Sequence, residues 1–496
     1  MRQALVTYKD WMELHPWQDK ADETVVYYVK LANKLAEVLR KNGFPQSVAI
    51  PSACGLAAYL EDVVSGGLLF GAARSLFIEK YNERIPMLEN EAIRYYNDEV
   101  NYSDVAFLIW HFESQSDKRS FVAPSDVKAR QPMIEELTAM LENAYEDAPE
   151  CNDLSVFLNM EEIDHPKFAD IVTRMIYLNK QSYLTAIGAN AEINQYAELL
   201  KTEGENMDEA SFFFFLSEYA NQMLFNQPLS FGCLYTNEFL AQLLGKDHVA
   251  YDAALSIGRD KLSTLYKYVG EKEDTVVLYH TESNTKIEVE KDSLSDKFLR
   301  DRTFWLCELV QFGDRFRCVS DIAYPEEEME EESPEQAEIL RHLFESKANR
   351  SAYLQKMKDA FDKLFNGKPF FIVSDIEKAY AKINEFFDES ALSRRIVIPT
   401  EEDPEGNILV YMNVDEGLEV YPTHLIFGRD DVKGAGEKLS YPQFTDVLTN
   451  DLFSRSFICE LINQGWISWP ENQDDDLLKR NAKFLLDYYK TEPSLV

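Results

Sequence analysis

The chain has 496 residues, of which 45% are hydrophobic and 13% aromatic, so it can bury the cores of several domains. Its 50 Lys and Arg stand against 87 Asp and Glu, and the formal net charge of -37 repels nucleic-acid phosphates and anionic lipid headgroups. We therefore expect no nucleic-acid partner and no membrane partner, and any partners should be other proteins.

The cysteines are spread along the chain and no two have the close spacing of a CxxC metal motif, which excludes a zinc ribbon or finger. They are Cys54, Cys151, Cys233, Cys307, Cys318 and Cys459. Most have apolar neighbours in sequence, as expected of buried free thiols in a reducing compartment. The N-terminus has no apolar signal segment, and no run of about 18 apolar residues occurs. We expect a cytoplasmic protein.

The first part of the chain has helical periodicity. Apolar residues from Asp22 onward recur at steps of three and four, and the helix should end at Asn42-Gly43. A second helix is predicted over Ser52–Ile78, broken or kinked by Gly66-Gly67. Further helices are predicted over Asp104–Glu113, Gln131–Tyr145 and His165–Asn190. We expect a helical domain over residues 1–205.

The middle part, residues 206–325, begins with helices and continues with strands. Asp208–Leu224 contains four consecutive phenylalanines and is predicted to be a core helix, and a second helix lies near Asn237–Leu244. The predicted strands are Tyr266–Val269, Thr275–Tyr279, Lys286–Glu290, Trp305–Val310 and Arg315–Val319. Short strands joined by tight turns favour a small antiparallel β-barrel of SH3-like or OB-like size.

The last part, residues 326–496, is predicted to be an acidic linker followed by an α+β domain. Residues Pro325–Pro334 are mostly glutamate and should be an extended linker. Helices are predicted over Pro334–Leu364 and Pro442–Tyr489, and strands over Arg395–Ile398, Ile408–Met412 and Leu425–Phe427. The overall fold class is α+β, and no internal repeat is present.

Carboxylates and one histidine near the N-terminus form the most suggestive polar group. Glu61, Asp62, Asp104 and His111 are the candidate catalytic residues. Asp104 and His111 are seven residues apart and lie on the same side of one helix, which Glu61 could face from another. Neighbouring helices build metal sites from such side chains, but no Glu-x-x-His motif is present. We favour the alternative, in which Asp104 caps its helix and the other side chains are ordinary polar residues at the surface.

Other motifs give no defined chemistry. Gly66-Gly67 and Gly71 lack the Lys-Ser/Thr of a phosphate-binding loop, so close helix packing is the preferred explanation of these glycines. No serine or cysteine lies in a nucleophile signature. The residues identify no cofactor and no defined metal site.

The aromatic residues of the predicted barrel have two interpretations. They are Tyr266, Tyr268, Tyr279, Trp305 and Phe316. Such residues can line a groove that binds an extended peptide, or they can fill the interior of a small barrel. Tyr266 and Tyr268 point to one face, and that face must be the core if there is only one core, so we favour the interior.

Four segments near the N-terminus carry a resemblance to a known family. They are Tyr8–Pro16, Tyr27–Asn33, Ala53–Gly66, and Tyr96–Asn101 continuing to Phe107–His111. In this order they resemble an uncharacterised Bacteroidetes family, a domain of unknown function, with motifs of the KDWLELHPY, YFEDVISG, DEIN and FLIWH types. The resemblance covers residues 1–110 best. It implies a bacterial intracellular origin but does not indicate any activity. The sequence departs from the family pattern at residues 57–60, before the acid pair.

Three hypotheses for function follow. The first is a cytosolic interaction or adaptor protein that binds basic or neutral proteins, because separate modules are present without a catalytic signature. The second is a metal-assisted hydrolase in which Glu61, Asp62, Asp104 and His111 line a pocket between helices. The third, a mimic of nucleic-acid charge, is weakest, because the acids are spread over the whole chain.

Overall fold

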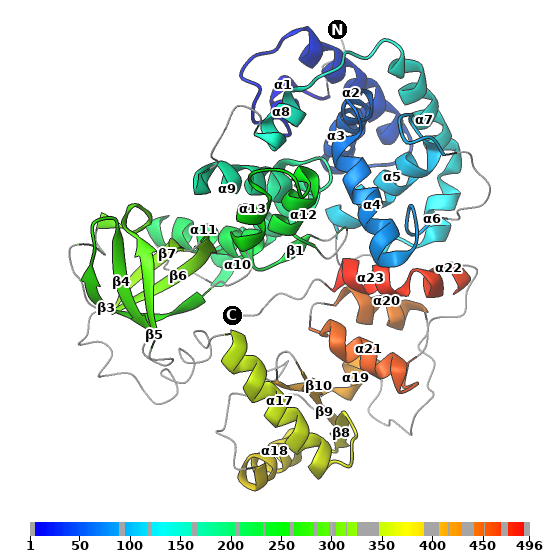
Figure 1. Ribbon diagram of the computed structural model, residues 1–496. Helices are drawn as coiled ribbons and strands as arrows, with labels where there is room; N and C mark the ends of the chain where they lie inside the picture. Colours follow the sequence, from blue (N-terminus) through cyan, green and yellow to red (C-terminus); the bar gives the residue numbers. More distant parts are fainter. Residues whose placement is uncertain are drawn as a thin grey trace. The chain divides into compact units, whose positions relative to one another are not determined.

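The computed structural model divides into two compact units (Figure 1). The N-terminal unit comprises Met1–Gly258 together with Glu471–Ser494, and the second unit comprises Arg259–Pro470 with the last two residues. The structure describes residues 5–88, 95–117, 121–160, 167–203, 209–229, 231, 234–257, 262–280, 285–296, 299, 304–313, 315–324, 347–390, 406–414, 417–427, 441–450, 452–467 and 475–490.

Helices dominate the N-terminal unit, as the periodicity predicts. They are α1 (Tyr8–Met12), α2 (Glu23–Lys41), α3 (Gln46–Val64), α4 (Leu68–Tyr81), α5 (Tyr102–Ser116), α6 (Pro124–Ala129), α7 (Gln131–Tyr145), α8 (Asp153–Asn159), α9 (Phe168–Ile176), a π-helical turn (Tyr177–Gln181), α10 (Ala186–Glu203), α11 (Glu209–Phe225), α12 (Thr236–Leu244), α13 (Tyr251–Ile257), α22 (Asp475–Arg480) and α23 (Ala482–Tyr489). A short hairpin pairs β1 (Pro228–Leu229) with β2 (Leu234–Tyr235).

The predicted ends of α2 are confirmed. The Asp22 side chain accepts a hydrogen bond from the backbone N–H of Val25 at the start of the helix, which satisfies one of the unpaired donors there. At the other end Gly43 has a φ of +93°, a left-handed conformation that glycine adopts without strain.

The predicted break at Gly66-Gly67 is also confirmed, but its cause is not close helix packing. A Cβ atom on Gly66 would meet nothing within 4 Å, and one on Gly67 would meet only a backbone oxygen at 3.9 Å. Both residues instead have positive φ, 108° and 67°, and they turn the chain from α3 into α4. Backbone conformation therefore explains these glycines.

Helix α3 is the centre of the N-terminal core. It is long and apolar enough to cross a membrane by length and composition, yet 72% of its most apolar stretch is buried inside the fold. Ala53, Leu56, Tyr59 and Leu60 are fully enclosed or nearly so. Burial on every side is typical of a core helix, and it places any polar residue of α3 in the interior.

The predicted helix over His165–Asn190 is interrupted. α9 ends at Ile176, a π-helical turn follows over Tyr177–Gln181, and α10 begins at Ala186. Within this break the Thr185 hydroxyl donates to the carbonyl oxygen of Leu178 at 2.8 Å. A side chain that binds the backbone in this way competes with helical hydrogen bonds, which apolar periodicity does not reveal.

Helix α11 differs from its prediction as a core helix. Met223, Leu224 and Phe225 at its C-terminal end are buried, but Phe213 is 57% exposed and Phe215 is 42% exposed. The prediction used hydrophobicity alone, which measures the tendency to be buried but does not show whether another element is there to cover the residue.

The last two helices belong to the N-terminal unit and not to the predicted domain 326–496. Phe484 of α23 contacts the rings of Phe77 and Trp110, with centroid distances of 5.9 and 5.7 Å. Helices from opposite ends of the chain thus share one core. Sequence order could not show this, because the second unit is inserted between them.

Five strands form the first part of the second unit, and all five were predicted. They are β3 (Leu262–Glu271), β4 (Thr275–His280), β5 (Thr285–Glu290), β6 (Phe304–Phe312) and β7 (Arg315–Tyr324), with a 3-10 turn over Lys291–Ser293. Their hydrogen-bonded order is β3-β4-β5-β7-β6, and β6 also pairs with β3. The sheet is not wholly antiparallel, because β5 and β7 are parallel through the pair Val289 and Phe316.

The aromatic residues of this sheet are divided between two environments. Tyr266 is fully buried in a cluster with Val276, Leu278 and Leu309, and Tyr268 and Phe316 pack against that cluster. Tyr266 and Tyr268 therefore belong to the core, as their shared face predicts, and Phe316 packs with them. Tyr279 is half-buried and is not part of the cluster.

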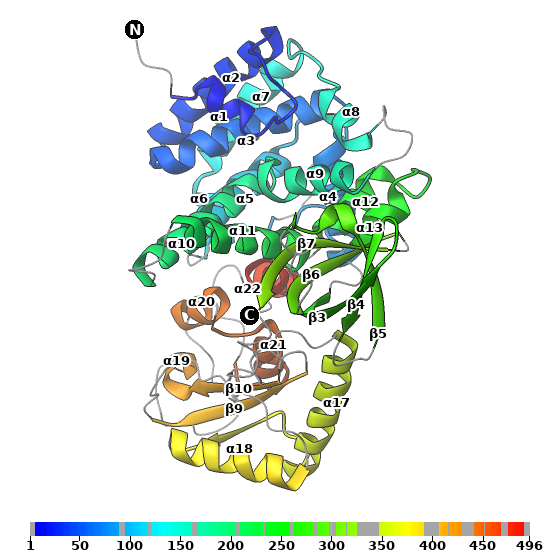
Figure 2. The ribbon, with the colours of Figure 1, turned by 90° about the vertical axis from the view of Figure 1, so that its left-hand side faces the viewer.

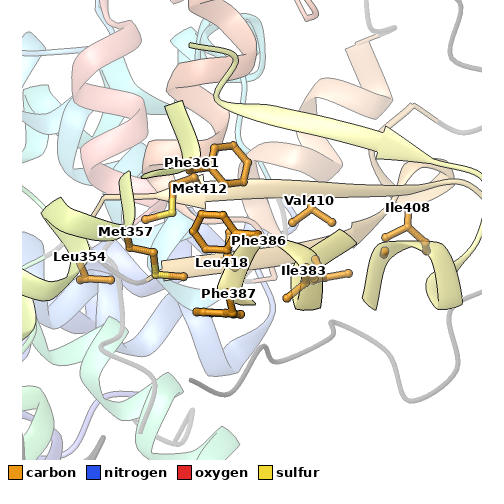
Figure 3. Packing of buried hydrophobic residues seen from close by; sticks show 12 residues of the cluster. Leu354, Met357, Phe361, Ile383, Phe386, Phe387, Ile408, Val410, Met412 and Leu418 are labelled. Atoms are coloured by element: carbon orange, nitrogen blue, oxygen red, sulfur yellow. The ribbon is translucent and has the colours of Figure 1, made fainter. Parts of the chain in front are cut away.

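The second unit ends in a mixed helix and strand region. Its elements are α17 (Lys347–Leu364), β8 (Phe370–Val373), α18 (Ile376–Ser390), β9 (Ile408–Asn413), β10 (Gly417–Pro422), α19 (Thr423–Phe427), α20 (Tyr441–Thr449) and α21 (Arg455–Asn463). The strands are antiparallel in the order β10-β9-β8. Figure 3 shows side chains of α17 and α18, among them Phe361 and Phe386, packed against Val410 and Met412 of β9.

This region confirms the α+β class and corrects one predicted strand. Leu425–Phe427 lies in α19, directly after Pro422 ends β10, because a run of three apolar residues does not distinguish strand from helix. β8 and β10 were not predicted. The predicted linker 325–334 and the predicted strand 395–398 lie outside the described residues.

Candidate functional site

Both members of the acid pair in α3 are buried, which requires each to have a polar partner. The side chain of Asp62, a residue of α3, lies beside the first residues of α4. Its carboxylate accepts hydrogen bonds from the backbone N–H groups of Leu69 and Phe70 at 3.2 and 2.9 Å, and from the Tyr183 hydroxyl at 2.7 Å. Burial raises the pKa of Asp62, and these donors oppose the rise. Asp62 thus joins α3 to α4 and to Tyr183.

Glu61 faces α1 and binds His15. Glu61 Oε2 lies 2.6 Å from His15 Nε2, and His15 Nδ1 lies 2.9 Å from the carbonyl oxygen of Trp11. Because that carbonyl can only accept, Nδ1 is the donor of this bond, and Nε2 faces the carboxyl group of Glu61. The Trp11 ring stacks on the imidazole at 4.1 Å, so the pair is enclosed by aromatic surface.

Cys151 also lies beside Glu61. Burial raises the pKa of its thiol to about 12, and the negative charge of Glu61 contributes to the rise. A thiolate is the reactive form of cysteine, and at neutral pH this thiol stays protonated. Burial beside Glu61 therefore disfavours the thiolate of Cys151.

Asp104 is buried, and it neither caps its helix nor lies at the surface, which corrects the favoured prediction. The N-cap of α5 is Asn101. Asp104 Oδ2 accepts hydrogen bonds from the hydroxyls of Tyr59 and Tyr95 at 2.8 and 3.0 Å, and Arg74 donates to the Tyr95 hydroxyl at 2.6 Å. Asp104 Oδ1 is buried without a hydrogen-bond partner. Burial is the main reason that the pKa of Asp104 rises to about 6.

The raised pKa of Asp104 predicts a pH-dependent stability. Because the folded state holds this proton more tightly than the unfolded chain, the contribution of Asp104 to stability is largest below about pH 4 and is lost as the pH rises through about 6. The full decrease is about 3 kcal/mol. In Asp104→Asn the side chain does not titrate, so this decrease should be absent. Urea unfolding of both proteins between pH 4 and 7.5 measures it, and parallel profiles would contradict the prediction.

His111 holds the C-terminal helix in place. Its Nε2 lies 2.6 Å from the carbonyl oxygen of Leu184, and its Nδ1 lies 2.7 Å from the Tyr488 hydroxyl of α23. In the neutral ring Nε2 donates to Leu184 and Nδ1 accepts from Tyr488. The Phe107 ring stacks on the imidazole with a centroid distance of 5.8 Å. Both ring nitrogens therefore serve contacts between helices.

The four candidate residues do not converge on one another. Each binds a different set of neighbours, and among the described residues no three His, Cys, Asp or Glu side chains are placed to share a metal ion. The partners that the sequence analysis missed are His15, Tyr59, Tyr95, Tyr183 and Tyr488. The sequence contained one indication of these partners, because an acid pair inside an apolar helix needs hydrogen-bond donors in the interior.

Exposed apolar side chains on α10 and α11 form the other notable feature of this unit. We call Leu199, Phe213 and Phe215 the α11 surface. Their exposed fractions are 46%, 57% and 42%. Phe212 and Leu216 are half-buried beside them. Figure 2 shows α10 and α11 side by side. Phe213 and Phe215 are two residues apart and therefore point to different sides of α11, and exposed aromatic residues are enriched in protein interfaces.

Comparison with known proteins gives one match. A family model described as "Protein of unknown function (DUF3843)" matches residues 6–281, more than half of the chain, and confirms the resemblance to a domain of unknown function. No curated protein and no solved structure matches the chain. The matched segment contains all four candidate residues and α11, whereas α23 lies beyond it.

Proposed function

Because the chain belongs to the DUF3843 family of proteins of unknown function, which supplies no activity, we propose from its own residues that it is an adaptor that binds other proteins. The α11 surface is the observation that carries this proposal. Its aromatic side chains are exposed, and aromatic residues supply much of the binding energy in protein interfaces. The net charge of -37 favours basic or neutral partners.

The alternative, a metal-assisted hydrolase, has less support. It needs Glu61, Asp62, Asp104 and His111 to face a common ion and a substrate. The donors that each of them binds come instead from separate elements, namely α1 for Glu61, the start of α4 for Asp62 and α23 for His111. These contacts give every one of the four side chains a role in holding helices together.

The strands β3 to β7 would form a separate module of this adaptor. We assign them to the small barrels of SH3-like or OB-like size, and the strand order that returns from β6 to β3 supports the assignment. We also place the protein in the bacterial cytoplasm. Support comes from the thiol of Cys54, which is buried as expected in a reducing compartment.

Capture from native lysate tests the adaptor proposal. The full chain, the double variant Phe213→Ser/Phe215→Ser and the control Val249→Ser, which changes a side chain that is 62% exposed elsewhere in the unit, serve as bait. We expect the same proteins to be recovered with the unaltered chain and the control, and their recovery to fall at least ~10-fold with the double variant, the equivalent of about 1.4 kcal/mol.

Equal recovery with all three baits would overturn the proposal, as would recovery of nothing reproducible. Circular dichroism melting of the three proteins establishes that they are folded. Phe213 is 57% exposed and Phe215 is 42% exposed, so we expect their replacement to lower the melting temperature by only a few degrees.

A further inference from the structure

Two arginines share one tyrosine beside α4. The guanidinium carbon of Arg84 lies 4.6 Å from the centre of the Tyr95 ring, and that of Arg74 lies 5.1 Å from the centre of the same ring. Arg74 belongs to α4, whereas Arg84 follows the end of that helix at Asn82, where a φ of +55° turns the chain. Aromatic rings attract cations, and Tyr95 thus brings two positive charges close to each other.

A chain of hydrogen bonds holds the Tyr95 ring in place. Its hydroxyl accepts from Arg74 Nη1 at 2.6 Å and donates to Asp104 Oδ2 at 3.0 Å. The Tyr59 hydroxyl of α3 donates to the same carboxylate oxygen at 2.8 Å. The ring that contacts Arg84 is therefore fixed by α4 and α5 before any ligand arrives, and a preorganised site loses little conformational entropy on binding.

The two arginines carry more positive charge than the described residues around them neutralise. Asp104 supplies one carboxylate against two guanidinium groups, and its link to Arg74 runs through the Tyr95 hydroxyl. Glu83, next to Arg84 in sequence, is bound by Arg480 Nε at 2.9 Å. Within the described part of the chain, neither Arg74 nor Arg84 forms an ion pair with a carboxylate.

An arginine without a carboxylate partner is unexpected in a chain with 87 Asp and Glu against 50 Lys and Arg. Several other arginines do have one, namely Arg130 with Glu113, Arg315 with Asp274, Arg317 with Glu290 and Arg480 with Glu83. A guanidinium group carries five N–H donors, and those of Arg84 make no hydrogen bond to the described residues. Arg84 is exposed, so these donors are accessible to a ligand.

We propose that Arg74 and Arg84 bind a phosphate group, either free or as part of a small ester. Guanidinium groups donate paired hydrogen bonds to phosphate oxygens. Arg74 contacts the Tyr95 hydroxyl and Arg84 lies over the ring, and the oxygens of a tetrahedral phosphate point in enough directions to meet both. A carboxylate has two oxygens in one plane, which a single guanidinium matches. The site is independent of the adaptor function proposed above.

Isothermal titration calorimetry of the full chain tests the proposal. The probes are inorganic phosphate, methyl phosphate and acetate, at a pH above the second pKa of phosphate. We expect at least one of the two phosphates to bind at least ~10-fold more tightly than acetate. Binding of inorganic phosphate alone would identify the free ion as the ligand, and equal or tighter binding of methyl phosphate would identify an ester. Equal affinity for acetate, or no binding of either phosphate, would overturn the proposal.

Substitutions locate the binding. We expect the affinity for phosphate to fall at least ~10-fold in Arg84→Gln and in Arg74→Gln, and to change by less than ~2-fold in Arg40→Gln. The control removes the same charge from an exposed arginine in the last turn of α2. Because Arg84 is exposed, its variant should stay folded, which circular dichroism melting checks. Unchanged affinity in Arg84→Gln would overturn the proposal, as would an equal fall in Arg40→Gln, the sign of diffuse charge attraction.

Discussion

Phe484→Ala is expected to lower the free energy of unfolding of the N-terminal unit by about 3–5 kcal/mol, the usual cost of removing a buried phenylalanine. Phe484 is 1% exposed. Its ring packs against Tyr81, Trp110 and Tyr488 with centroid distances of 5.3, 5.7 and 5.5 Å. The substitution would leave a cavity between α4, α5 and α23, because aromatic rings held from three helices cannot collapse fully into it.

Hydrogen exchange of the α5 backbone amides provides a readout that is specific for the N-terminal unit. We expect faster exchange in Phe484→Ala than in the unaltered chain, together with a lower midpoint of urea unfolding. Lys483→Ala is the matched control on the same helix, since Lys483 is exposed and its loss should change stability by less than about 1 kcal/mol. Similar exchange in the two variants would contradict a structural role of α23.

Asp62→Asn is expected to destabilise the N-terminal unit by about 2–4 kcal/mol. The carboxylate accepts hydrogen bonds from the N–H groups of Leu69 and Phe70 and from the Tyr183 hydroxyl. An amide offers one oxygen and turns its NH₂ group towards the remaining donors, and each buried donor left unpaired costs about 1–3 kcal/mol. Removing a buried charge, whose presence burial disfavours, offsets part of this cost.

Asp170→Asn is the matched control for Asp62→Asn. Asp170 also accepts from a backbone N–H at a helix start, that of Lys167 at 2.8 Å, but the bond is exposed. Water can replace the lost acceptor there, so we expect a loss of about 1 kcal/mol or less. Urea unfolding measures both variants. An equal loss in the two would show that Asp62 is not the buried link between α3, α4 and Tyr183.

Local patterns in the sequence predicted most of the helices and strands correctly. The cap at Asp22, the glycines that end α2 and α3, and the five strands β3 to β7 all follow from short-range spacing and turn chemistry. The prediction of a strand at Leu425–Phe427 was wrong, because three apolar residues are too few to distinguish a strand from a helix.

The structural roles of the candidate residues could not be predicted from the sequence. Glu61 and Asp62 are consecutive in one helix, yet they point to α1 and to α4, because side chains one residue apart do not share a helix face. His15, Tyr183 and Tyr488, which bind the candidates, are distant in sequence and belong to no motif with them.

Composition and short-range spacing were enough to predict the acidic charge, most helices and strands, and the family, since these depend on neighbours a few residues apart. The three-dimensional fold was needed to show that α23 completes the N-terminal core and that Phe213 and Phe215 are partly exposed. Both outcomes depend on which distant segments meet, and hydrophobicity drives burial without specifying the partner.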